Sequence, residues 1–220
     1  MLLSYLYSNF FEERDFAEAV GLSPTELNAL FIKRILPGAS YRLDLDIRSS
    51  SFVANHQRQD AYRFHLKGHL DWVKAIQRLS LESESGARAY FEARYGLAKS
   101  TFLCGSLGCR LDALAPEVIA AFDADRAEAT WVNFLAGVYG VCTRDGQPES
   151  VFLKQAAVDF VDHLIALDRI EETAQHLPLL HELVDFLDGV ESDFAPHEVA
   201  QSSRQRCIVD VRTRFSLPVG

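Results

Sequence analysis

Two helix boundary signals near the start of the chain constrain its fold most. Gly21 is followed closely by Ser23, Pro24 and Glu26. Glycine adopts the left-handed conformation that ends a helix at little cost. A serine N-cap, a proline in the first turn and a glutamate three residues after the serine form a capping box that begins the next helix. The short turn between the signals predicts a helix-turn-helix within residues 14–43.

Neighbouring residues predict where these two helices begin and end. Asp15 and Glu18 have the spacing of a capping box for the first helix. In the second helix the pair Pro37-Gly38 predicts the end. Its apolar positions recur at helical spacing: Leu27, Leu30, Phe31 and Ile35.

The next segment changes from helical to alternating periodicity. Residues 40–49 place apolar side chains at every second position, which predicts a half-buried strand. Residues 49–60 are expected to form a polar loop, and residues 61–66 a return strand. Residues 67–79 predict an amphipathic helix with these side chains facing inward or nearly so: Leu70, Val73, Ile76 and Leu79. A helix-turn-helix, a two-stranded wing and a helix follow the order of a winged helix.

The second half of the chain carries mostly helical patterns. Residues 103–110, "LCGSLGCR", are expected to form a glycine-rich loop, and a helix is expected to begin at Pro148. That helix has one apolar stripe, formed by Phe152, Ala156, Phe160, His163 and Leu164. The expected fold class is mainly α. A winged-helix-like module with a two-stranded wing, residues 1–80, precedes an all-α module of about five helices, residues 81–220.

Charge distribution bears on the partners of the two modules. Residues 1–80 hold 10 Lys/Arg and 9 Asp/Glu, whereas residues 81–220 hold 12 and 22. The acidic second half repels phosphate, and the first half attracts it weakly. The second helix also begins with Thr25, Glu26 and Asn28, without an arginine or tyrosine for a phosphate or base. Nucleic acid is therefore a disfavoured partner, and a role in protein contact or in packing on the second half is favoured for the first module.

The location of the protein follows from signals that the sequence lacks. No apolar run reaches the roughly 18 residues of a membrane span, so no membrane association is expected. The N-terminal residues carry neither a basic region nor a cleavage site of a secretory signal. We therefore expect a cytoplasmic protein with reduced cysteines.

Two stretches resemble known families. The segments "GLSPTEL", "RILPGASYRL" and "AYRFHLKGHLDWVKAI" resemble the MerR type of winged helix over about residues 10–80, which implies DNA binding, although the wing loop is longer than usual there. The segment "WVNFLAGVYGVCTRDGQPESVFLKQAAV", residues 131–158, together with "PGASYRL", resembles an uncharacterised bacterial family labelled as natural-product biosynthesis proteins. That resemblance implies a setting in secondary metabolism and no particular reaction.

Cysteines and histidines are the first candidates for a metal or catalytic site. Cys104 and Cys109 are spaced as C-x4-C, but a second pair at short spacing is missing, so no metal and no cofactor are expected. Arg110 beside a helix start has the charge to hold an anion. His65 and His69 are expected to serve at a surface or hinge.

The segment at residues 137–150 is the stronger candidate for a ligand site. Polar side chains gather there between the end of one expected helix and the start of the next, and a helix N-terminus favours anions. The residues are Tyr139, Cys142, Thr143, Arg144 and Glu149. The alternative is that Arg144 and Glu149 only tie a helix corner together.

Three functions stay open at this level. The first is an accessory protein or an undemonstrated enzyme of natural-product biosynthesis that binds a small molecule or a biosynthetic protein partner through its helical module. The second is a ligand-responsive, MerR-like DNA-binding regulator. The third is a catalyst that uses Cys104 or Cys142. The sequence decides neither whether the protein is an enzyme nor whether it forms a homodimer.

Overall fold

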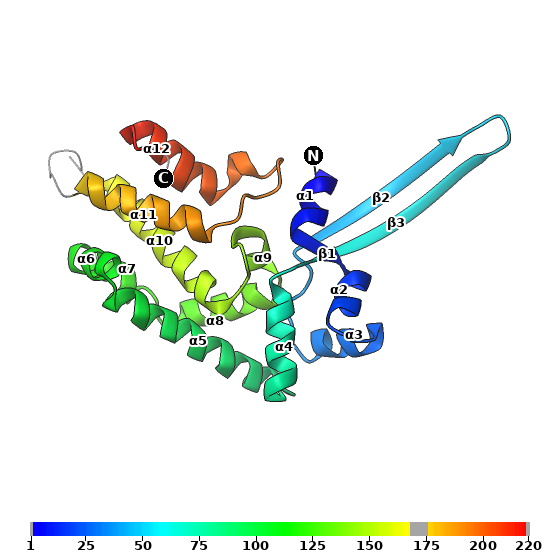
Figure 1. Cartoon of the computed structure of the whole chain (residues 1–220), viewed down its shortest axis with the longest axis horizontal. Coiled ribbons are helices and arrows are strands. Elements are labelled where there is room, and N and C mark those ends of the chain that lie inside the picture. The colour runs from blue at the N-terminus through cyan, green and yellow to red at the C-terminus, as the bar shows by residue number, and fades with distance from the viewer. Residues whose placement is uncertain (1, 168–175, 219–220) are drawn as a thin grey trace.

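The computed structural model describes residues 2–167 and 176–218. The protein is mainly helical, with one small antiparallel sheet of three strands (Figure 1). Among the described helices, none is long and apolar enough to cross a membrane.

The N-terminal part alternates helices with the three strands. Its elements are α1 (Leu2–Asn9), β1 (Phe10–Glu12), α2 (Glu13–Ala19), α3 (Pro24–Ile32), β2 (Tyr41–Ser50), β3 (Asn55–Leu66) and α4 (His69–Leu79). Strand β3 lies between β1 and β2 and pairs antiparallel with both. The sequence did not predict α1 or β1. In the case of β1, a strand of three residues is too short to show a period.

The expected capping box of α3 is confirmed. The Glu26 amide donates to Ser23 Oγ at 3.3 Å, and the Ser23 amide donates to Glu26 Oε2 at 2.8 Å. Gly21 has a φ of +68° and follows the C-cap of α2, as predicted. The capping box expected from Asp15 and Glu18 is wrong, because α2 begins at Glu13, directly after β1. The pairing of β1 in the sheet thus sets the start of that helix.

The predicted end of α3 is also wrong. The helix ends at Ile32, well before Pro37, and Arg34 takes a φ of +55°. Ile35 lies beyond the helix and is fully buried, and its carbonyl accepts a hydrogen bond from the Trp72 indole at 2.9 Å. Burial of this segment in the core therefore ends the helix before the proline does.

The hairpin of β2 and β3 is longer than the sequence predicted. The loop expected at residues 49–60 is reduced to residues 51–54, and the polar residues from Asn55 to Asp60 belong to β3. Their backbone groups pair with β2, so the strand needs no buried side chains there. Figure 1 shows the hairpin extending away from the rest of the molecule as an arm.

The described residues of the second half form mostly helices. They are α5 (Glu84–Cys104), α6 (Ser106–Leu114), α7 (Pro116–Ala120), α8 (Ala124–Leu135), α9 (Val138–Cys142), α10 (Pro148–Ala166), α11 (His176–Val190), a 3-10 turn (Val199–Gln201), a π-helical turn (Gln205–Val209) and α12 (Asp210–Phe215). The glycine-rich loop expected at residues 103–110 is wrong, because only Gly105 separates α5 from α6. The described part also holds more than five helices here, because residues 116–142 fold into three short ones.

Two large hydrophobic cores organise the molecule. One packs α10 against α5 and α11, and the stripe expected on α10 is buried in it except for His163, which lies at its edge. The other joins residues from both sides of position 80, including Phe16, Trp72, Trp131 and Phe134. Val73 and Ile76 of α4 are buried, but Leu79 is 44% exposed, contrary to the inward placement expected.

Candidate functional site

A tight corner between α5 and α6 frames the most apolar depression of those described here. The Gly105 amide donates to the carbonyls of Thr101 and Phe102, which closes the last turn of α5. Gly108 then packs directly on that turn, since a Cβ at this position would lie 2.1 Å from the Phe102 carbonyl oxygen. Glycine at this position therefore lets α6 approach the end of α5.

We call the resulting depression the α5 groove; it has a volume of about 480 Å3. Side chains of α5, α6, α10 and α11 line it, mainly Leu97, Phe102, Leu107, Leu153 and Phe186. Leu97 is 65% exposed. A groove of this size lies within the range of about 300–1,000 Å3 for ligand pockets, which are lined mainly by apolar side chains.

One charged side chain, Glu149, is among the lining residues of the α5 groove. Its two carboxylate oxygens accept from Nε and Nη2 of Arg94, each at 2.7 Å. A third Arg94 nitrogen donates to Gln147 Oε1 at 3.0 Å. This fork of hydrogen bonds fixes Glu149 at the start of α10.

Three of the residues expected to carry chemistry lie beside this groove. Cys104 ends α5 and Cys109 lies in α6, and both are exposed free thiols. Arg110 is paired with Glu182 at 2.5 Å and also donates to the Ser106 carbonyl. In residues 2–167 and 176–218, no group of three or more metal-ligating side chains gathers, at the cysteines or elsewhere.

The residues expected at the corner of residues 137–150 face different surroundings. Tyr139 is 5% exposed, and its hydroxyl accepts from Gln155 at 2.8 Å inside the protein. Thr143 is buried and accepts from the Gly146 amide. Arg144 is about half exposed and donates to the carbonyl of Asp188 at 3.1 Å. The Tyr139 hydroxyl therefore lies inside the protein, whereas the Arg144 guanidinium lies at the surface.

A buried carboxylate that the sequence did not single out lies behind this corner. Glu191 is fully buried, accepts a hydrogen bond from the Ser203 hydroxyl and lies 3.6 Å from Lys154 Nζ. Burial raises the pKa of Glu191 and also that of the neighbouring Cys142 thiol. A raised thiol pKa disfavours the thiolate that nucleophilic catalysis requires. Glu191 follows the end of α11, where its amide donates to the Leu187 carbonyl at 2.9 Å and its backbone forms a short bridge with Thr143. No local sequence pattern indicates that bridge.

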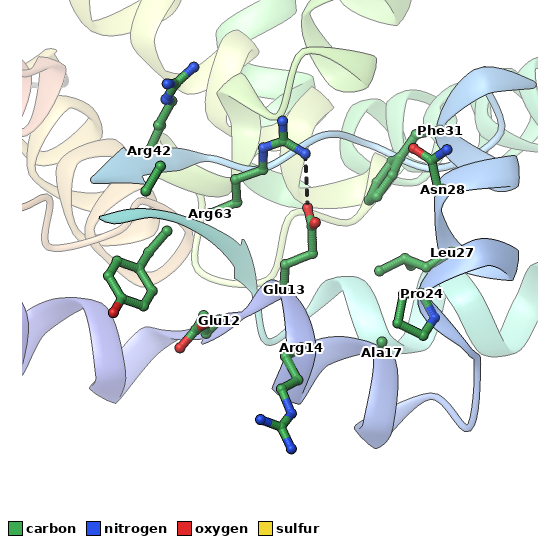
Figure 2. Close-up of a pocket in the computed structure, with 12 residues that line it drawn as sticks. Glu12, Glu13, Arg14, Ala17, Pro24, Leu27, Asn28, Phe31, Arg42 and Arg63 are labelled. Atoms are coloured by element: carbon green, nitrogen blue, oxygen red, sulfur yellow. Dashed lines mark ion pairs between the residues drawn. The ribbon is translucent and has the colours of Figure 1, made fainter. Parts of the chain in front are cut away.

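A second depression lies between α3 and the hairpin, and we call it the α3 groove. Two adjoining hollows of about 370 and 430 Å3 share Glu13, Asn28, Phe31, Arg42 and Arg63. Figure 2 shows the Glu13 carboxylate and the Arg63 guanidinium meeting across it, at 3.5 Å, while the guanidinium groups of Arg14 and Arg42 point away. The groove therefore offers mixed charge rather than a converging cluster of cations.

His65 forms part of the wall of this groove and is buried. Its ring stacks between Phe16 and Phe31, and its Nε2 lies 3.3 Å from Glu13 Oε2. Burial lowers the pKa of His65, while the Glu13 carboxylate opposes that shift. The end of β3 enters the core here, so the surface position that was one of the two alternatives expected for His65 is wrong.

His69 is buried as completely, at 1% exposure, and the surface position expected as one alternative for it is wrong too. Neither ring nitrogen has a hydrogen-bond partner in the described residues, and burial lowers its pKa to about 3. Backbone packed closely around the imidazole ring keeps His69 buried. A Cβ on Gly68 would lie 2.1 Å from the Asp145 carbonyl, and one on Gly146 would lie 2.5 Å from His69 Nε2.

The chain is thus a mainly helical protein with a small antiparallel sheet and an apolar groove in its helical half. It belongs to a family of unknown function (DUF6058), whose sequence profile matches residues 87–216, more than half of the chain. The expected membership of an uncharacterised family is confirmed to that extent. No curated protein and no solved structure matches the chain.

Proposed function

We propose that this protein is an accessory binding protein of bacterial natural-product biosynthesis, and that its α5 groove holds an apolar ligand or partner segment. The observation that carries the proposal is the groove itself, which leaves Leu97 65% exposed beside Phe102, Leu107 and Phe186. Contiguous apolar surface of this kind marks binding sites on proteins. The groove also lies wholly within the residues that the family profile matches.

The surroundings of the α5 groove support binding rather than catalysis. Its frame is rigid, because α5 and α10 pack on each other through the buried residues Phe102, Phe152 and Phe160. Glu149 is held in place by Arg94 through two hydrogen bonds, so its carboxylate oxygens already have partners. The setting in natural-product biosynthesis rests on the resemblance of residues 131–158, and it names no reaction.

A neutral apolar dye tests the groove directly. Nile red should bind with a rise in fluorescence, and Leu97→Glu should abolish that rise because the charge lies inside the apolar space. Ile32→Glu is the matched control, since Ile32 is 73% exposed on α3 and lies outside the groove. Equal dye binding by both variants, each with an unchanged far-ultraviolet circular dichroism spectrum, would sink the proposal.

For the N-terminal part we propose a winged-helix module that contacts protein. This proposal is supported by the order helix, strand, two helices and hairpin, with β1 paired to β3, because a winged helix has the same order; α3 would then take the recognition position. Polar residues on α3 are exposed, but Glu26 lies in its first turn and Glu13 in the adjoining groove. Carboxylates at this surface repel a phosphate backbone.

The second candidate function is a ligand-responsive DNA-binding regulator, which that element order favours. Fluorescence anisotropy with a random duplex at low salt should show weak binding at best. Arg63→Ala, which removes a cation from the α3 groove, should then change little. Submicromolar affinity that falls steeply with salt and is lost in Arg63→Ala would make the regulator the better assignment.

A further inference from the structure

The tip of the β2–β3 hairpin is the most exposed apolar feature in the described part of the protein. Phe52 is 103% exposed relative to the reference state, and Val53 is 75% exposed. Both lie in the turn, where Ser51 fixes the loop by accepting from the amides of Val53 and Ala54. An ordered arm that presents an aromatic side chain at its end is a feature of contact surfaces.

The charges beside the tip and in the α5 groove are paired in place. Arg48 pairs with Asp46 at 3.0 Å and Arg58 with Asp60 at 2.7 Å, and neither Asp nor Glu occurs between residues 47 and 59. Among the described residues that line the α5 groove, Glu149 is the charged one, and Arg94 holds it through two hydrogen bonds. The tip can therefore enter the groove without leaving an unpaired charge buried, as a buried contact requires.

We propose that Phe52 and Val53 of one copy insert into the α5 groove of a second copy, in a reciprocal dimer. Figure 1 shows the tip and the α5–α6 corner at opposite ends of the molecule, so the tip does not reach its own groove. A two-fold axis across the long axis lays two copies antiparallel. Each tip then lies at the groove end of the other copy, which closes the assembly.

The size of the groove fits this occupant. Its volume of about 480 Å3 exceeds what one phenylalanine and one valine side chain occupy. Each phenylalanine buries about 150–250 Å2, so two tips alone fall short of the roughly 1,200–2,000 Å2 of a standard interface. The dimer is therefore of the weak, reversible class, in equilibrium with monomer, and an apolar ligand competes with the tip.

This inference rests on the proposed role of the α5 groove, and sedimentation velocity tests it. The wild-type chain should show concentration-dependent dimer formation, and Phe52→Asp and Leu97→Glu should each be monomeric. Ile32→Glu should dimerise like the wild type. A mixture of the Phe52→Asp and Leu97→Glu chains should recover part of the dimer, because one intact tip then meets one intact groove. Phe52 is at the tip of an exposed turn, so its replacement leaves the core unchanged.

A cross-link reports the contact at the level of residues. Cys104 is an exposed thiol next to Gly105 of the groove. Val53→Cys should therefore give a disulfide-linked dimer under mild oxidation, which Cys104→Ser removes or reduces at least tenfold. Ile32→Cys should not cross-link faster than the wild type.

Dye binding separates this inference from the function on which it rests. Phe52→Asp should increase Nile red binding, because it empties the groove. A wild-type chain that is monomeric at its highest soluble concentration, or dimers that persist in Phe52→Asp, would overturn the reciprocal dimer. If Leu97→Glu still abolished dye binding in that case, the proposed function would stand with another apolar occupant.

Discussion

The contact between Gly108 and the end of α5 gives the sharpest test of how the α5 groove is built. In Gly108→Ala the new Cβ would lie 2.1 Å from the Phe102 carbonyl oxygen and 2.7 Å from its carbonyl carbon. Backbone atoms cannot turn aside, so α6 has to shift. We expect a cost of about 3 kcal/mol, at the upper end for overpacking. The better helix propensity of alanine offsets about 1 kcal/mol of this cost, so the free energy of unfolding should fall by about 2 kcal/mol.

Gly96→Ala is the matched control for this change. Gly96 lies within α5, and outside the helix backbone no atom of the described residues lies within 4 Å of a Cβ there. That variant should gain about 0.5–1 kcal/mol from helix propensity alone. At about 2–4 °C for each kcal/mol in a chain of this size, Gly108→Ala should melt about 4–8 °C lower and Gly96→Ala about 1–4 °C higher.

Differential scanning calorimetry of the two variants beside the wild type measures these shifts, and Nile red binding reports the shape of the groove. Gly108→Ala should also weaken dye binding, whereas Gly96→Ala should leave it unchanged. A Gly108→Ala protein as stable as Gly96→Ala, with normal dye binding, would refute the close contact between α6 and the end of α5.

Three further predictions concern stability. Ser23→Ala removes the capping box of α3 and should cost about 1 kcal/mol in urea denaturation. Arg94→Lys keeps the charge but loses the two-bond fork to Glu149, and we expect a loss of about 1 kcal/mol, less at high salt. Burial lowers the pKa of His69 to about 3, below the roughly 6.5 of an unfolded histidine, so protonation favours the unfolded chain. Stability from His69 is complete above about pH 6.5 and falls by up to about 1.4 kcal/mol per pH unit below it, and His69→Leu should flatten urea midpoints measured between pH 7 and 5.

The sequence predicted those elements whose signals are local. The capping box of Ser23 and the helix end at Gly21 depend on residues only a few positions apart, so the sequence alone predicts them. The apolar stripe on α10 was also predictable, because burial of one helix face requires apolar residues at the helical period. The start of α2 and the end of α3 were wrong for the opposite reason, since sheet pairing and the burial of Ile35 set them from a distance.

The candidate sites show the same division. Glycine in "CGSLGC" suggested a loop, yet Gly105 and Gly108 serve a tight helix corner, because the close approach of α6 to Phe102 is a tertiary contact. The α5 groove also draws Leu153 and Phe186 from helices more than 40 residues away. No spacing rule joins such positions. The exposure of Leu97 depends on which face of α5 packs against the neighbouring helices, and that is a tertiary contact.

The pairing of charges along the hairpin, by contrast, could be predicted from its sequence pattern. In a strand, residues two apart share a face, so "RLDLDIR" places arginine and aspartate side by side. Each hairpin arginine is paired, and the pairs are Arg42–Asp44, Arg48–Asp46, Arg58–Asp60 and Arg63–Glu13. A guanidinium that already has a carboxylate partner must give it up before it can neutralise a phosphate, and counterion release is what supplies most nonspecific DNA affinity. An arm with paired charges along its length and an unpaired phenylalanine at its end is better suited to an apolar groove than to a phosphate backbone.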